Sequence, residues 1–167
     1  LASAVWITDA SPSESPDRPV MAGTVTGATP ALSVIVNGSV GGTTIEYFQL
    51  DDGGDTTRGV QNAKKLLGEH NIDALIGPST TPIALAILDL IAEGKVPLMA
   101  TVGTSSVVEP LDARKRWVYK TTQNDDLIAE ALIKHMKKAG VANVGFIGFN
   151  DPYGENWLKV FGALAEK

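Results

Sequence analysis

The chain alternates between short apolar runs and longer stretches in which apolar residues recur at helical spacing. The clearest example is residues 74–106, where two short apolar runs, Ala74–Ile76 and Val96–Ala100, flank a helix-length apolar segment. This order predicts a strand, a helix and a second strand that runs parallel to the first. Both strands end in loops rich in Ser, Thr and Gly. Because ligands of open parallel sheets bind beyond the carboxyl ends of the strands, these two loops predict a binding crevice.

The same patterns predict further elements on both sides of this unit. Strands are expected at Val20–Thr26, Thr43–Leu50, Arg116–Lys120 and Val144–Phe149, and helices at 55–70, Asn124–Ala139 and Tyr153–Glu166. Alternating strands and helices are typical of an α/β fold with a doubly wound, mostly parallel sheet. Val5-Trp6-Ile7 precedes a stretch rich in Pro and Ser at 10–19, so we expect it to be a stray strand or a docking arm.

Composition narrows the class of protein and of partner. The 167 residues include 44% hydrophobic and 20% charged side chains, which suits a soluble domain with a buried core. The net charge of -5, with Arg114-Lys115-Arg116 as the longest basic run, argues against a nucleic acid partner. No Cys is present, so disulfides, thiolate metal sites and Cys nucleophiles are excluded. The longest apolar run, at 83–92, is shorter than the ~20 residues that span a bilayer.

Two loops and one aromatic residue carry the candidate chemistry. The loop Gly77–Pro82 ends with a Pro suited to the first turn of a helix, and Ser79–Thr81 offer side-chain caps. Free backbone N–H groups at such a helix start favour a carboxylate or a phosphate. The loop Ala100–Ser105 follows the next strand and is expected to lie beside the first. Tyr153 follows a predicted strand and is placed to close over a ligand. Helix capping, an ordinary polar loop and a Tyr that caps the core remain alternatives.

The remaining motifs are weaker indications of function. Thr24–Thr29 matches T-x-T-G-x-T, the phosphate-binding pattern of flavodoxins, which leaves a flavodoxin-like redox protein that binds FMN as an alternative. Asp51, Asp52 and Asp55 lack the spacing of a calcium-binding loop, so we interpret them as strand-end and helix-cap carboxylates. The two histidines stand alone, and no catalytic motif is present. We therefore expect no metal, no cofactor and no catalytic residue.

Four stretches together resemble a known family. They read IEYFQLDDGGDTTRGVQNAKKLL, DALIGPSTTPIALAILDLIAEGKVPLMA, RWVYKTTQND and VGFIGFNDPYGENWL. In this order they resemble the type I solute-binding proteins of ABC transporters, the leucine/isoleucine/valine-binding family. The resemblance implies two flavodoxin-like α/β lobes that close on an amino acid or a related small carboxylate, including aromatic acids. It also implies a periplasmic or other extracytoplasmic location, docking on an ABC permease, and no enzymatic activity.

The resemblance assigns ligand contacts to particular residues. Ser79 and Thr80 correspond to the serine loop that binds the ligand carboxylate in the family. Val102 and Thr104 correspond to the backbone and hydroxyl contacts of the next loop. Tyr153 corresponds to the aromatic residue that the second lobe folds onto the ligand.

The resemblance also predicts how the chain is divided. Residues 1–19 are expected to form an arm and linker, 20–121 the first lobe, and 122–167 a hinge crossing and the first α-β-α piece of a truncated second lobe. With half of the usual site, ligand binding is expected to be weak. The apolar strand and helix faces of the second lobe are expected to pack across two copies, as a homodimer. A half-length dimeric interaction or sensor domain that no longer transports is therefore a further alternative.

Overall fold

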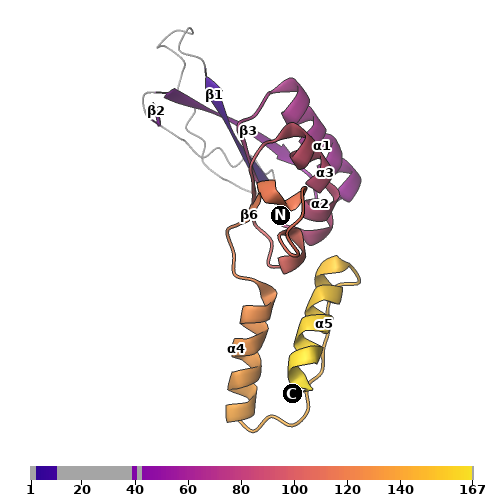
Figure 1. Ribbon diagram of the computed structural model, residues 1–167. Helices are drawn as coiled ribbons and strands as arrows, with labels where there is room; N and C mark the ends of the chain where they lie inside the picture. Colours follow the sequence, from indigo (N-terminus) through magenta and orange to yellow (C-terminus); the bar gives the residue numbers. More distant parts are fainter. Residues whose placement is uncertain (1–2, 11–38, 41–42, 167) are drawn as a thin grey trace, which may run out of the picture.

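The computed structural model describes residues 3–10, 39–40 and 43–166 (Figure 1). In these ranges the strands form one sheet with the order β2-β3-β1-β4-β5-β6. The strands are β1 Ser3–Ala10, β2 Ser39–Val40, β3 Thr43–Asp51, β4 Ala74–Ile76, β5 Leu98–Ala100 and β6 Val118–Lys120. The predicted strand Val20–Thr26 and the T-x-T-G-x-T motif at Thr24–Thr29 lie outside the described residues.

The directions of the strands place the carboxyl ends of β3 to β6 at one edge of the sheet. β4 pairs with β5 and β5 with β6 in parallel, with Leu75 opposite Leu98 and Leu98 opposite Val118. β1 is antiparallel to both β3 and β4, so β3 and β4 point the same way, and β2 is antiparallel to β3. Four strands therefore share one direction, and the predicted mostly parallel α/β sheet is confirmed.

The position of β1 corrects one expectation. Val5-Trp6-Ile7 was expected to be a stray strand or a docking arm, but β1 lies inside the sheet, between β3 and β4. It pairs with β3 over its whole length, from Ser3 opposite Asp51 to Ala10 opposite Thr44. The prediction was wrong because the place of a strand in a sheet depends on partners far away in the sequence. The division of the chain into an arm and two lobes stays a prediction, but the sheet already includes residues 3–10.

The helices follow the predicted pattern with one break. They are α1 Thr56–Glu69, α2 Thr81–Ala86, α3 Leu88–Gly94, α4 Asp125–Lys138 and α5 Pro152–Ala165, with 3₁₀ turns at η1 Ser105–Val107 and η2 Lys115–Trp117. The apolar run after Pro82 was expected to form one helix, but Ile87 divides it into α2 and α3. None of the helices in the described ranges is long and apolar enough to cross a bilayer.

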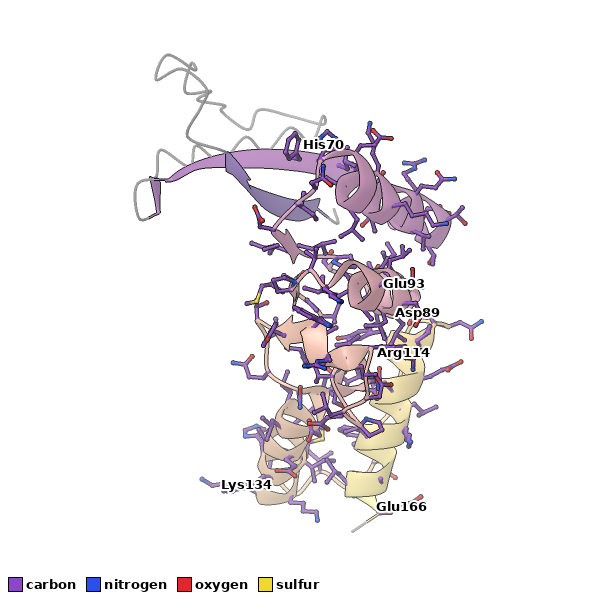
Figure 2. All side chains as sticks on the ribbon, turned by 45° about the horizontal axis from the view of Figure 1, so that its top comes forward. His70, Asp89, Glu93, Arg114, Lys134 and Glu166 are labelled. Carbon is purple, nitrogen blue, oxygen red and sulfur yellow. The ribbon has the colours of Figure 1, made fainter. Side chains whose placement is uncertain are left out.

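The core lies between the sheet and the group of α1, α2 and α3, which stand together in Figure 1. Its largest fully buried apolar side chains come from these helices, from β4 and β5 and from η1: Leu66, Leu75, Ile83, Ile87, Ile91, Leu98 and Val107. The loop before β6 is held against α3 by an ion pair between Arg114 and Asp89, 3.6 Å apart (Figure 2).

The last part of the chain departs from the prediction at one segment. α4 and α5 run side by side, and α5 also contacts α2 (Figure 1). Val144–Phe149 was predicted to be a strand but forms none, and Ile147 is fully exposed, at 101%. A strand needs a neighbour for its backbone hydrogen bonds. Within the described ranges, the sheet does not extend to this segment.

Candidate functional site

A cavity of about 400 Å³ lies at the carboxyl edge of the sheet. One wall consists of residues after β4 and β5: Ser79, Thr80, Thr81, Thr101, Val102 and Gly103. The other wall comes from the segment that leads into α5: Phe149, Asp151 and Tyr153. We call these the hydroxyl wall and the aromatic wall. Four of the five predicted site residues, Ser79, Thr80, Val102 and Tyr153, thus line one cavity.

The hydroxyl wall is held together by the parallel pairing of β4 and β5. The Gly77 backbone N–H donates to Met99 O at 3.0 Å, which continues the ladder beyond the strand ends. Thr101 Oγ1 donates to Pro78 O at 2.9 Å and ties one loop to the other. The two loops therefore form a single surface, as expected for neighbouring parallel strands.

Two hydroxyls of this wall have no partner among the described residues. Thr80 Oγ1 and Thr81 Oγ1 are buried and make no hydrogen bond to any described residue. Thr81 is only 2% exposed. A buried hydroxyl without a partner costs about 1–3 kcal/mol, so both groups are suited to donate to an acceptor that enters the cavity. α2 has six residues, so these hydroxyls, rather than a long helix dipole, supply the polarity of this wall.

Thr104 differs from the other predicted residues because it does not line the cavity. It is fully buried, and its hydroxyl accepts from the Ser106 backbone N–H at 3.3 Å and lies 2.7 Å from Ser106 Oγ. These bonds cap η1. Thr104 is therefore buried at the start of η1, and its contact with a ligand stays a prediction.

The aromatic wall is set by a capped helix start. Asp151 Oδ1 accepts from the backbone N–H groups of Tyr153 and Gly154, at 2.9 and 3.0 Å, and so caps α5. Phe149 and Tyr153 also line a second cavity of about 400 Å³, whose lining is mostly apolar. Its residues are Phe146, Ile147, Gly148, Phe149, Tyr153, Gly154 and Trp157. The aromatic wall thus continues into an open apolar surface.

Sequence reasoning missed five lining residues. Thr81, Thr101 and Gly103 adjoin the predicted residues in the same two segments. The sequence pattern therefore indicated each segment as a whole as part of the site, rather than single residues within it. Phe149 and Asp151 stand just before Tyr153, at the end of the segment that was predicted to be a strand. Their position after an apolar run could have identified them.

A short crossing, residues 120–125, connects the two walls. Thr122 Oγ1 donates to Val102 O at 2.7 Å, and Lys120 Nζ donates to Gly103 O. Asp125 is 1% exposed, and burial raises the pKa of its carboxyl although Asn156 donates a hydrogen bond to it. Burial also lowers the pKa of the Lys120 ammonium.

Other candidate groups have structural partners. Asp51 and Asp52 accept from the Gly53 and Gly54 backbone N–H groups at 2.8 Å, and Asp55 caps α1, which confirms their interpretation as strand-end and cap carboxylates. The His70 ring stacks on Phe48 with centroids 4.1 Å apart. No group of three or more residues suited to hold a metal ion occurs in the part of the chain that the structure describes.

Known proteins resemble this chain along most of its length. A family model for periplasmic binding proteins matches residues 6–167. The Leu/Ile/Val-binding protein BraC3 of Rhizobium johnstonii is 28% identical over 130 residues, which cover 75% of this chain and 34% of that protein. An extracellular ligand-binding receptor from Rhodopseudomonas palustris HaA2 is 48% identical with a TM-score of 0.74, and the match covers 77% of this chain and 36% of that one.

A more distant structure shares the fold. It is a solute-binding protein of an ABC transporter from R. palustris in complex with 4-hydroxybenzoate, 21% identical with a TM-score of 0.61, and the match covers 67% of this chain and 30% of that one. The chain thus spans about a third of the length of the relatives that it matches.

Proposed function

This chain belongs to the periplasmic binding protein family, and from that premise we propose that it is the ligand-binding part of a solute-binding protein that serves an ABC importer. Its ligand is a branched-chain amino acid or a related small carboxylate, aromatic acids included. The protein works outside the cytoplasmic membrane, in the periplasm, and delivers the ligand to an ABC permease. Its role is to bind and release, without catalysis.

The cavity between the hydroxyl wall and the aromatic wall is the observation that supports this function. A ligand carboxylate needs donors, and Thr80 and Thr81 offer buried hydroxyls that have no partner among the described residues. The apolar part of the ligand then packs on Phe149 and Tyr153. Among the described lining residues, Asp151 carries the only charge. A negative side chain at this place favours a ligand that also has an ammonium group, such as an amino acid.

The affinity of this chain alone is expected to be weak. A micromolar site corresponds to about −8 kcal/mol, and half of that free energy, about −4 kcal/mol, corresponds to a millimolar dissociation constant. The chain spans about a third of the length of its relatives, so part of the usual set of contacts lies outside it.

Titration of the purified chain tests the proposal. Isothermal titration calorimetry and NMR chemical-shift mapping with L-leucine and with 4-hydroxybenzoate are expected to show a saturable site in the millimolar range. The shifts should centre on the backbone signals of 79–81 and 101–103. Glycerol, which has hydroxyls but no carboxylate, is the control and should leave these signals unchanged. A chain that responds to neither acid contradicts the proposal.

The exposed apolar segment 144–149 favours a second candidate. Ile147 and Phe149 are 101% and 73% exposed, and α4 adds Leu127 at 57%. Exposed apolar area of this kind marks a contact surface for protein. In a preparation of this chain by itself we propose that the surface pairs with a second copy. A dimer that binds neither acid would support a half-length interaction or sensor domain in place of transport.

A further inference from the structure

The two walls of the cavity are connected through Asp125. The hydroxyl wall belongs to the loops after β4 and β5, whereas the aromatic wall belongs to the segment that leads into α5. Asn156 lies on α5, two residues after the buried Gly154, and its Nδ2 donates to Asp125 Oδ2 at 2.9 Å. The backbone N–H of Asp125 donates to Gly103 O, in the hydroxyl wall, at 3.1 Å. Asp125 therefore bonds to both parts of the site while it lines neither wall.

Residues 120–125 hold the loop after β5 through hydrogen bonds to the carbonyl oxygens of that loop. Val102 O accepts from Thr122 Oγ1, and Gly103 O accepts from the Asp125 N–H and from Lys120 Nζ. In a trans peptide the C=O group and the next N–H group point in opposite directions. These bonds therefore turn the amides of Gly103 and Thr104 away from the crossing and fix the direction of the donors in this loop.

The contact between Gly103 and Asp125 leaves no spare room. A Cβ atom at position 103 would overlap Asp125 Oδ1. Asp125 is 1% exposed and cannot turn into solvent. Lys120 reinforces the same junction, because its Nζ also donates to Asn124 Oδ1 at 2.6 Å. A small displacement of Asp125 is therefore expected to move the loop after β5, through Gly103, and α5, through Asn156.

We propose that Asp125 is a positioning residue that sets the separation of the hydroxyl wall and the aromatic wall through its bonds to Gly103 and Asn156. This inference rests on the proposed function, because the separation of the walls matters only if a ligand binds between them. Loss of the Asn156 bond weakens the connection between α5 and the crossing and leaves the bonds to the hydroxyl wall in place. The aromatic wall then samples more positions relative to the ligand.

The test measures the separation without a ligand. Because the chain has no Cys, spin labels can be placed on Glu93→Cys of α3, labelled in Figure 2, and on Lys159→Cys of α5. Electron–electron double resonance, with labelled protein diluted into excess unlabelled protein, gives the distance distribution within one chain. The variant Asn156→Ala removes the bond to Asp125. Asn62→Ala is the matched control, since Asn62 also donates from its amide, to Asp51 O at 3.2 Å, and belongs to neither wall of the cavity.

We expect Asn156→Ala to broaden the distance distribution and to weaken L-leucine binding about tenfold, because the aromatic wall is then less preorganised for the ligand. Gly103→Ala, which displaces Asp125 from the other side, should shift the same distribution, and Asn62→Ala should not. An unchanged distribution in both variants overturns the inference, and so does a changed distribution with wild-type affinity. If the wild-type chain binds neither L-leucine nor 4-hydroxybenzoate, the proposed function fails, while the distances still decide whether Asp125 positions α5.

Discussion

Among single residues, the buried threonines Thr81 and Thr104 differ in their hydrogen bonds. Thr81 lines the cavity with a hydroxyl that has no partner among the described residues, whereas the Thr104 hydroxyl bonds to Ser106 beneath the loop. An unpaired buried hydroxyl lowers the stability of the empty protein and is available to a ligand. A paired hydroxyl stabilises the loop, and a ligand would have to compete with the existing partner for it. We therefore expect substitution of Thr81 to affect mainly ligand binding, and substitution of Thr104 to affect mainly the stability of the fold.

Replacement of each threonine by Val tests this separation. Thr81→Val should leave the free energy of unfolding unchanged or raise it by up to about 1 kcal/mol, because it removes an unpaired group, while it weakens L-leucine binding. Thr104→Val should lower the free energy of unfolding by about 1–2 kcal/mol and leave binding unchanged. Urea denaturation and calorimetric titration measure the two effects. Equal effects of both variants on binding would contradict the assignment of Thr81 to the site.

The pKa of Asp125 predicts a pH effect with a definite sign. Burial raises the pKa of this carboxyl in the folded chain above its ordinary value of 3.8, so the folded state holds the proton more tightly than the unfolded state. The stability contribution of Asp125 is then greatest at low pH and falls as the pH rises through the folded pKa. Asp125→Asn removes this term. The melting temperature of the wild type should therefore rise relative to that of the variant as the pH falls from 7 to about 4.

That measurement has its own control. Asp126→Asn removes the neighbouring carboxyl on the same first turn of α4, which is half-buried. If the Asp125→Asn difference stays constant over this pH range, Asp125 does not titrate differently in the folded and unfolded chain, and the predicted effect of its burial is wrong.

Among the secondary structure elements, the place of α2 depends on how closely α1 approaches it. A Cβ atom at Gly59 on α1 would overlap the Ile83 side chain on α2, whereas a Cβ atom at Gly68, on the same helix, meets nothing within 4 Å. Both glycines are helical. If an alanine substitution lowers the free energy of unfolding at Gly59 but not at Gly68, the difference therefore reports on the packing of α1 against α2.

Two alanine variants measure that packing. Gly59→Ala should destabilise the protein by about 1–3 kcal/mol, because the added methyl group overfills a tight contact. Gly68→Ala should stabilise it by about 0.5–1 kcal/mol through the better helix propensity of Ala. Thermal and urea unfolding give both values. A Gly59→Ala variant as stable as Gly68→Ala would show that α1 and α2 are not in close contact at Gly59.

The sequence was sufficient to predict elements whose signal is local. The run Ala74–Ile76 forms β4 as predicted, and the two hydroxyl-rich loops meet because β4 and β5 are neighbours. This is why the predicted residues Ser79, Thr80 and Val102 line one cavity. β1 and the segment 144–149 were misjudged because strand pairing depends on distant partners that no local pattern contains. Thr104 shows the same limit at a single position: its burial beside η1 depends on the surrounding fold, and its contact with a ligand stays a prediction.

For the whole molecule, the second wall of the cavity and the exposed apolar surface belong to the same segment. Phe149 lines the cavity and is also 73% exposed, while Ile147 beside it is fully exposed. Whatever covers the segment 144–149 therefore also supports the aromatic wall. Covering this surface should stabilise α4 and α5 and restrict Tyr153, so association and ligand binding are expected to be coupled in this chain.

The coupling gives a final prediction for the chain prepared by itself. Light scattering should report a dimer, and Ile147→Lys should shift it to a monomer, because a charge cannot be buried in the apolar contact without a large cost. Leu111→Lys is the matched control. Leu111 is also an exposed aliphatic residue, at 76%, but it lies in the loop before η2 and not in the segment 144–149. Since the dimer supports the aromatic wall, Ile147→Lys should also weaken L-leucine binding. A wild-type chain that is monomeric at every concentration would contradict the proposed pairing, and a monomeric Ile147→Lys variant with full affinity would show that the aromatic wall stands without it.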